Sequence, residues 1–332
     1  MNFKENDIRP EDLMEKKKPA LEHDITYLQD RIPLFVSVNC VACGSDNHSV
    51  WGEKMKFTYS ECGECKTIFM NPRGDENLMG EFYKQSKNYA FWNKYIFPAS
   101  DEIRKEKIFR PRANKTVGFC KKYGVKGGTM LEIGSAFGTY CEAVSDLKYF
   151  ERIVAVEPTP GLAETCREKG IETFEQTIED LEFKKESVDV VANFEVIEHL
   201  SNPKKFIQQS ADLLRKGGIF ICTCPSGTGL GTLVLKEQAK VVDHEHVNYF
   251  NGDSLSLVLA ECGLETLEVS TPGELDAEML YSEFKSNPEA FKTNSFFSHL
   301  FQNLNDTTLG EFQQFLKDNL LSSHLWIVAR KV

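Results

Sequence analysis

The chain has 332 residues, of which 41% are hydrophobic and 27% are charged, enough to bury a sizeable core in one large or two modest domains. This composition excludes intrinsic disorder, collagen-like repeats and a small disulfide scaffold. The formal net charge of −11 argues against a protein whose whole surface binds nucleic acid or anionic membrane. Residues 1–18 lack the apolar core of a signal peptide, and no apolar run is long enough to span a membrane. We therefore expect a cytoplasmic protein.

Residues 1–39 form the first predicted segment, a polar helical arm with a helix over about 11–30. The next segment, 40–73, contains four of the ten cysteines, arranged as two Cys-x-x-Cys pairs. Paired cysteines at this spacing, with glycines in the turns, are typical of a tetrahedral Zn²⁺ site. The predicted ligands are Cys40, Cys43, Cys62 and Cys65. Short strand-like stretches between the pairs make a structural zinc ribbon the expected shape, and four free buried thiols are the alternative.

Residues 74–126 are predicted to form a helical lid or linker, rich in aromatic residues and interrupted at Pro98 and Pro111. Between residues 84 and 122 there are eleven basic and three acidic side chains. This excess could attract an anionic acceptor. Alternatively, the charges form solvated helix faces, with intrahelical pairs Asp101–Lys105 and Glu106–Arg110.

From residue 127 onward, strand and helix patterns alternate, which specifies a doubly wound parallel sheet buried on both faces. The expected strands are 129–133, 153–157, 188–194, 219–224, 267–270 and 325–329. The expected helices are 139–147, 161–169, 203–215 and 254–262, with further helices at 278–285, 295–304 and 310–319. The last three lie in a helical insertion at about 272–321, within a domain spanning 127–332.

The first strand of this domain runs into a glycine turn, Gly134-Ser-Ala-Phe-Gly138, before a helix. The pattern lacks the Gly-x-Gly pair that dinucleotide-binding loops place around a pyrophosphate. The next strand ends at Glu157, where a carboxylate can hold both hydroxyls of a ribose. Together these features indicate an adenosine-bearing ligand without a diphosphate.

Four stretches in register, LEIGSAFGTY, VAVEP, VDVVANFEVIEHL and LLRKGGIFICTCP, resemble the successive motifs of class I S-adenosylmethionine-dependent methyltransferases. The resemblance covers about residues 129–267 and implies a Rossmann-like α/β sheet with an antiparallel last strand. It also implies S-adenosyl-L-methionine as the cofactor. The cofactor-binding residues implied by position are Glu132, Gly134, Gly138, Glu157, Ile178, Phe194 and Glu195. Many members have Asp-Ala where this chain has Thr177-Ile178, so the adenine contacts are the least defined.

Residues 242–250 read Val-Asp-His-Glu-His-Val-Asn-Tyr-Phe, the densest acid/base cluster in the sequence. Together with the ribbon, this segment resembles the zinc-containing methyltransferases of deoxysugar and glycan biosynthesis. The resemblance implies His246 as general base, Glu245 as the residue that orients or assists it, and Tyr249 as a polar neighbour. A structural histidine that fixes the loop is the alternative reading of His246. His199 and His324 are expected to orient the loop and to pack, respectively.

The sequence therefore predicts methyl transfer to a small-molecule acceptor, a sugar or an anionic nucleotide-linked sugar. Oxygen or nitrogen methylation is favoured over carbon methylation, because Asp243 stands where some sugar C-methyltransferases have tyrosine. The alternative is an RNA or protein methyltransferase whose ribbon recognises a macromolecule. Acidic and basic residues cancel between Cys40 and Arg73, which disfavours nucleic acid as a partner. The sequence leaves the oligomeric state open.

Overall fold

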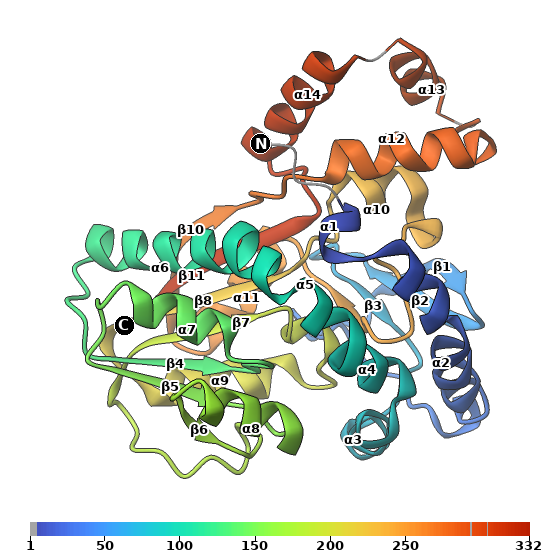
Figure 1. The fold of residues 1–332 in the computed structure, drawn as a ribbon. Helices are drawn as coiled ribbons and strands as arrows, with labels where there is room; N and C mark the ends of the chain where they lie inside the picture. Colours follow the sequence, from blue (N-terminus) through green and yellow to red (C-terminus); the bar gives the residue numbers. More distant parts are fainter. Residues whose placement is uncertain (1–4, 293, 304) are drawn as a thin grey trace.

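The computed structural model describes residues 5–292, 294–303 and 305–332. It contains a seven-stranded sheet with helices on both faces and a separate four-stranded sheet (Figure 1). The order of the large sheet is β10-β11-β8-β7-β4-β5-β6. Strand β11 is antiparallel to both of its neighbours, whereas the strands from β8 to β6 run parallel to one another. The predicted Rossmann-like fold with an antiparallel last strand is confirmed.

The strands of the large sheet fall close to the predicted ranges. They are β4 (Thr129–Ile133), β5 (Arg152–Val156), β6 (Glu172–Phe174), β7 (Val188–Phe194), β8 (Leu214–Pro225), β10 (Leu264–Ser270) and β11 (His324–Lys331). The short edge strand β6 was not expected, because it has three residues and Glu172 is exposed, so it lacks the apolar run that marks the buried strands.

The helices around the sheet separate into two layers. Helices α9 (Pro203–Leu213) and α11 (Gly252–Glu261) cover one face, where they meet side chains such as Leu131. Helices α6 (Arg110–Tyr123), α7 (Thr139–Asp146) and α8 (Pro160–Glu168) contribute to the core on the other face, which includes Met130. Consecutive residues of a strand therefore pack into the cores on opposite faces of the sheet, which explains why the strands are apolar without interruption.

The small sheet joins the cysteine-containing segment to a distant part of the chain. Its strands are β1 (His48–Lys54), β2 (Phe57–Cys62), β3 (Ile68–Met70) and β9 (Asn248–Tyr249), in that order. Strand β9 belongs to the acid/base segment predicted from the sequence, and it pairs antiparallel with β3. A strand of two residues has no detectable period, so this pairing could not be expected from sequence.

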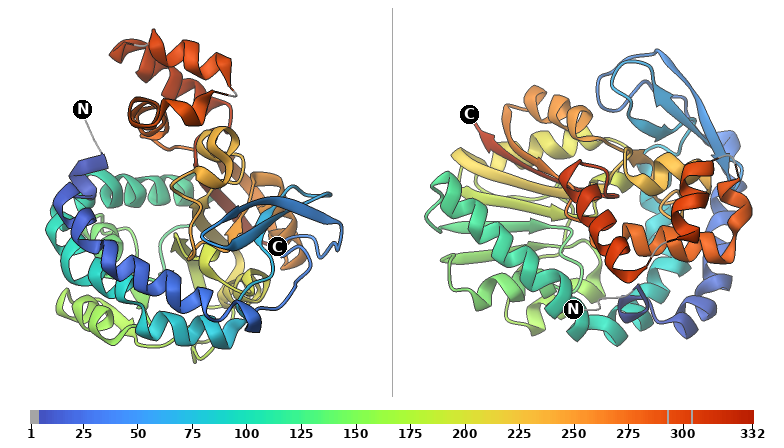
Figure 2. Two further views of the ribbon diagram at one scale, coloured as in Figure 1. Left: turned by 90° about the vertical axis from the view of Figure 1, so that its right-hand side faces the viewer. Right: turned by 90° about the horizontal axis from the view of Figure 1, so that it is seen from above.

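The N-terminal arm consists of α1 (Glu5–Ile8), α2 (Glu11–Gln29) and a 3₁₀ turn, η1 (Ile32–Leu34). Helix α2 packs against the first three of the six helical segments that follow the ribbon (Figures 1 and 2). The six segments are α3 (Glu76–Gln85), α4 (Lys87–Phe91), the π turn η2 (Trp92–Ile96), α5 (Phe97–Arg104), the π turn η3 (Lys105–Phe109) and α6.

The expected interruptions at Pro98 and Pro111 do not occur. Each proline lies in the first turn of the helix that follows a π turn. The hydrogen-bond register shifts at a π turn, so a proline without an N–H is tolerated there and the helix continues.

The remaining helices and turns lie after β7. They are the 3₁₀ turn η4 (Ile197–His199), α10 (Leu230–Leu235), η5 (Lys236–Gln238), and, between β10 and β11, α12 (Asp276–Ser286), η6 (Pro288–Phe291), α13 (Ser295–Gln302) and α14 (Asp306–Asp318). The predicted end of helix 295–304 lies outside the described residues. Among the helices that the structure describes, none has the length and apolar character needed to cross a membrane.

Candidate active site

The glycine turn after β4 requires glycine at both of its ends. Gly134 and Gly138 have φ angles of +77° and +67°, a region that side chains disfavour. A Cβ atom at Gly134 would lie 2.6 Å from Cγ2 of Val196, and one at Gly138 would lie 2.8 Å from Cδ1 of Ile171. The turn is therefore close-packed backbone at the carboxyl end of β4, the edge of the sheet where α/β proteins bind ligands.

Glu157 is held beside this turn by backbone donors. One carboxylate oxygen accepts the N–H of Ala136 and the other accepts the N–H of Thr159, both at 2.9 Å. The side chain is only 3% exposed, and burial raises its pKa. The predicted residue Ile178 is buried in the apolar core.

Glu132 lies beneath the turn, where it is 3% exposed. Its Oε2 lies 3.0 Å from the thiol of Cys141, and burial raises its pKa to about 8 although Arg112 opposes the shift. Arg112, from α6, places its guanidinium 4.8 Å from the ring centre of Phe194. Sequence reasoning missed Arg112 because it is one of many basic residues in the lid.

Glu195 directly follows β7 and has a positive φ of 55°. Its Oε1 accepts the hydroxyl of Thr223 at 2.7 Å and lies 3.5 Å from Nη2 of Arg112 and 3.4 Å from Nδ1 of His324. Burial alone would raise the pKa of Glu195, but the nearby His324 and Arg112 lower it overall. His324, expected only to pack, thus faces this carboxylate.

His246 lies in the loop before β9 with one ring nitrogen committed to the backbone. Nδ1 is 2.8 Å from the carbonyl oxygen of Val241. Because a carbonyl only accepts, Nδ1 carries the proton and Nε2 keeps a lone pair. The ring of His199 lies 4.8 Å away, centre to centre, and His199 donates from Nδ1 to the carbonyl of Glu245 at 3.1 Å.

In the described structure the side chain of Glu245 makes its polar contacts with Asn88 and His244 and not with His246. Its Oε1 accepts the amide of Asn88 at 2.7 Å and lies 3.4 Å from Nε2 of His244, and burial raises its pKa. His246 instead contacts Val241 and the carboxylate of Asp243, whose Oδ2 is 3.5 Å from Nδ1. The orientation of His246 therefore depends on Val241 and Asp243.

Tyr249 is fully buried and its hydroxyl is engaged within the loop. The hydroxyl donates to the carbonyl of Val241 at 3.1 Å and accepts the N–H of Asp243 at 3.2 Å. Tyr59, from the ribbon strand β2, donates to the carbonyl of Asp243 at 2.5 Å. Two tyrosines thus fix the backbone that carries His246.

A second link between the ribbon and the loop runs through Arg73 and Asn248, which are 3% and 0% exposed. Arg73 donates to the side-chain oxygen of Asn248 at 2.8 Å and to the carbonyl of Ser201. The amide of Asn248 donates to the carbonyls of Ile197 and Leu200, at 3.1 and 2.8 Å. Neither residue belongs to a recognisable motif, so no sequence pattern indicated this link.

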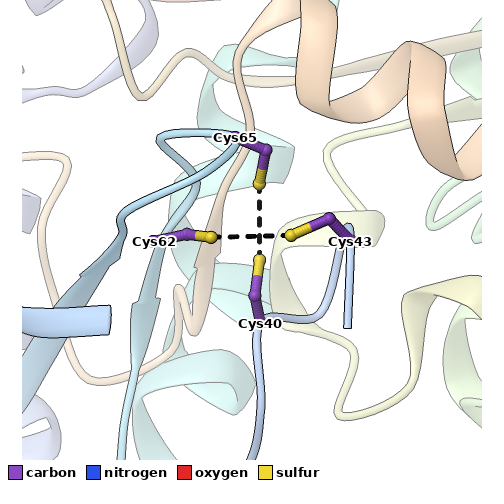
Figure 3. Close-up of side chains that lie close together, drawn as sticks. All are labelled: Cys40, Cys43, Cys62 and Cys65. Atoms are coloured by element: carbon purple, nitrogen blue, oxygen red, sulfur yellow. Dashed lines mark hydrogen bonds between the residues drawn. The ribbon is translucent and has the colours of Figure 1, made fainter. Parts of the chain in front are cut away.

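The four predicted metal ligands point their sulfur atoms at a common centre (Figure 3). The Sγ atoms of Cys40 and Cys65 are 3.4 Å apart, and those of Cys43 and Cys62 are 3.5 Å apart. Sulfur ligands 2.3 Å from a tetrahedral Zn²⁺ would be separated by about 3.8 Å, so the donor set fits the ion. Gly44 provides the positive φ after one pair, as expected, but Lys66 rather than Gly63 does so after the other.

The N-terminal arm also contributes contacts near the loop that carries Glu245. Asp24 of α2 is 1% exposed and accepts hydrogen bonds from the hydroxyl of Ser86 and the backbone N–H groups of Lys87 and Asn88. These contacts cap the start of α4 and place Asn88 against Glu245. A single aspartate in a polar helix belongs to no motif that predicts a capping role for it.

The family model described as "Methyltransferase domain" matches residues 103–269, about half of the chain. The chain belongs to this family, and the enzyme is an S-adenosylmethionine-dependent methyltransferase. An uncharacterized protein of Methanocaldococcus jannaschii is 24% identical over 58% of this chain and 84% of its own length.

Other relatives are matched over smaller shares of their length. The ubiquinone biosynthesis O-methyltransferase of Ruegeria pomeroyi is 28% identical over 43% of this chain and 62% of its own. The C-methyltransferase NovU of Streptomyces niveus is 25% identical over 47% and 38%. Among solved structures, an S-adenosylmethionine-dependent methyltransferase of Thermotoga maritima has 17% identity and a TM-score of 0.46, covering 73% of this chain and 98% of that one.

Proposed function

We propose that the enzyme methylates an oxygen or nitrogen atom of a small-molecule acceptor, a sugar or nucleotide-linked sugar, with His246 as general base. The supporting observation is the tautomer of His246, whose Nδ1–H is donated to Val241 so that Nε2 is free to accept a proton. The acceptor would lie between this nitrogen and the glycine turn. The resemblance to sugar-modifying methyltransferases supports the acceptor class.

The proposed cofactor residues surround the turn. Gly134 and Gly138 would let the ligand approach the backbone, and Glu157 would hold the ribose with Ile178 near the adenine. Glu132, Phe194 and Glu195 would face the amino-acid part, and Arg112 would pair with its carboxylate. Bound S-adenosylmethionine supplies an electrophilic methyl group, and the products are the methylated acceptor, S-adenosylhomocysteine and one proton, which His246 accepts.

We further propose that the zinc ion is structural and that the ribbon organises the active-site loop. Pairing of β3 with β9 and the hydrogen bond from Tyr59 to Asp243 support this role. The same pairing occupies one edge of the ribbon sheet, which disfavours the alternative in which the ribbon captures RNA or protein.

The test is transfer of labelled methyl from S-adenosylmethionine to three panels: neutral and nucleotide-linked sugars, total RNA, and total protein. Label in the sugar panel is the expected outcome. Label confined to RNA or protein would overturn the proposed acceptor, and absence of S-adenosylhomocysteine binding in calorimetry would overturn the proposed cofactor site.

A further inference from the structure

Two arginines from separate segments converge beside the lid without a full set of counter-charges. Arg104, at the end of α5, donates from Nη2 to the carbonyl of Ile8 at 2.8 Å, which brings it to the residue before Arg9. Arg9 follows α1 of the arm. The contact therefore joins the arm to the lid, and the charge of Arg9 acts on Arg104.

The hydrogen bonds of Arg104 go to neutral groups. Its Nε donates to the hydroxyl of Ser100 at 2.8 Å, and its guanidinium lies 4.9 Å from the ring centre of Phe97. Among the residues that the structure describes, no carboxylate lies within ion-pair distance of Arg104. Asp101 of the same helix is engaged elsewhere, 2.8 Å from Oγ1 of Thr139. A guanidinium has five N–H donors, so donors remain available.

Arg9 is only partly satisfied. Its Nη1 pairs with Glu5 at 3.0 Å, but its Nε is buried without a hydrogen-bond partner in the described structure. Burial, together with the nearby charges of Arg9 and Arg112, lowers the pKa of Arg104 to about 10. Like charges held together in a partly dry site are stabilised when an anion binds between them.

The π turn η3 directs Arg104 toward the active site. Arg104 and Arg112 are eight residues apart, and in an α-helix they would differ by about 80° around the axis. A π turn absorbs an extra residue, so the Cα atoms of Arg104 and Arg112 lie on one face of the continuous helix, about 12 Å apart along its axis. Phe97, under Arg104, contacts Phe137 of the glycine turn, with ring centres 5.5 Å apart. Arg104 is thus separated from the glycine turn by the ring of Phe97.

We propose that Arg9 and Arg104 bind an oxyanion carried by the acceptor, a phosphoryl or carboxylate group. This inference rests on the proposed function, because it places the anion on the molecule that receives the methyl group. Paired guanidiniums from two segments suit such a group, since each can donate two parallel hydrogen bonds to its oxygens. The inference also divides the basic lid: Arg104 faces inward, whereas Arg110 on the surface pairs with Glu106 at 2.7 Å.

The test uses the full chain saturated with S-adenosylhomocysteine and titrated with inorganic phosphate at constant ionic strength, followed by calorimetry and by the melting temperature. Wild type is expected to bind phosphate and to be stabilised by it. Arg104→Gln and Arg9→Gln should raise the phosphate Kd at least tenfold, and Arg104→Lys should restore part of the affinity. The matched control, Arg110→Gln, should bind phosphate as wild type does.

Arg104→Gln also removes a hydrogen bond to the N-terminal arm, so its effect could come from a change in structure. Arg9→Gln, at a half-exposed position, is therefore an independent second variant. A parallel titration with acetate distinguishes a carboxylate site from a phosphoryl site. The inference is overturned if wild type binds neither anion, if both glutamine variants bind like wild type, or if phosphate competes with S-adenosylhomocysteine. Binding of S-adenosylhomocysteine itself should be unchanged in Arg104→Gln, so failure of the cofactor site is measured separately.

Discussion

Single side chains in this enzyme take their chemistry from the backbone groups that hold them. His246 keeps a basic Nε2 because Nδ1 is committed to the carbonyl of Val241. The neighbouring His199 is made a poor base, since burial, together with the nearby His246, lowers its pKa to about 3. Of two adjacent imidazoles, His246 is therefore the better candidate for the proton acceptor.

Replacing His246 by alanine should lower turnover by at least about 100-fold, the usual contribution of a general base, while S-adenosylhomocysteine affinity stays within about twofold. The measurements are labelled-methyl transfer and calorimetry. His299→Ala, at an exposed histidine of α13, is the matched control. Wild-type turnover in His246→Ala would remove His246 from the mechanism.

Glu132 should make the stability of the ligand-free enzyme depend on pH. Burial raises its pKa in the folded state to about 8, above the ordinary value of 4.5. The folded state thus binds the proton more tightly, and its advantage is complete below about pH 4.5 and is lost as the pH rises toward 8. Glu132→Gln should flatten this part of the profile and raise the melting temperature at pH 8, measured by scanning calorimetry between pH 5 and 9. A wild-type slope in the variant would contradict the assignment.

At the scale of elements, the four-cysteine ribbon and the loop that carries His246 are one unit. Ile68 pairs with Tyr249 and Phe69 pairs with Asn248. A change that destabilises the ribbon should therefore alter the position of His246 and leave the cofactor site unchanged.

Removal of zinc tests this coupling. We expect about one equivalent of zinc in the purified enzyme, and its chelation should lower the melting temperature, because structural zinc contributes directly to folding. Turnover should fall while S-adenosylhomocysteine affinity is retained. Recovery on adding Zn²⁺ back is the control for damage by the chelator. Full turnover in metal-free protein would show that the ribbon does not position the loop.

The sequence predicted those elements whose signal is local. Uninterrupted apolar strands such as β4 and β7, and the glycine turn with its positive φ angles, are determined by residues close together in the chain. The cysteine pairs belong to the same category. Features that depend on distant partners were missed: β9 pairs with β3 only in the folded chain, and Arg73 and Asn248 meet across the molecule.

In the lid, a shift in helix register changes which side chains form the ion pairs expected four residues apart. The expected pair Asp101–Lys105 does not form, because the π turn begins at Lys105 and turns its ammonium to Glu142, 2.7 Å away. The expected pair Glu106–Arg110 is present at 2.7 Å. Spacing rules for α-helices assume a constant 3.6 residues per turn, which this helix does not keep.

At the scale of the whole molecule, three segments far apart in the chain meet at Glu245. Asp24 of the arm caps the helix that presents Asn88, and Asn88 donates to Glu245. The arm is therefore part of the framework of the proposed acceptor site and not only a lead into the ribbon.

Asp24→Asn should lower turnover by about tenfold, because losing charge-assisted hydrogen bonds of this kind costs about 1.5 kcal/mol. Affinity for S-adenosylhomocysteine should remain unchanged, as measured by calorimetry. Asp12→Asn, on the same helix and paired with Lys16 at the surface, should behave like wild type. Equal turnover in both variants would mean that the arm does not position Glu245.

The pairing of β3 with β9 also bears on how the chain folds during synthesis. The cysteine pairs leave the ribosome early, but the last strand of their sheet follows only after β4, β5, β6, β7 and β8 have been made. Until then, β3 has an unpaired edge, which is a template for wrong strand partners. Bound zinc would hold the early ribbon together through this interval, so metal supply during translation should affect the yield of folded enzyme.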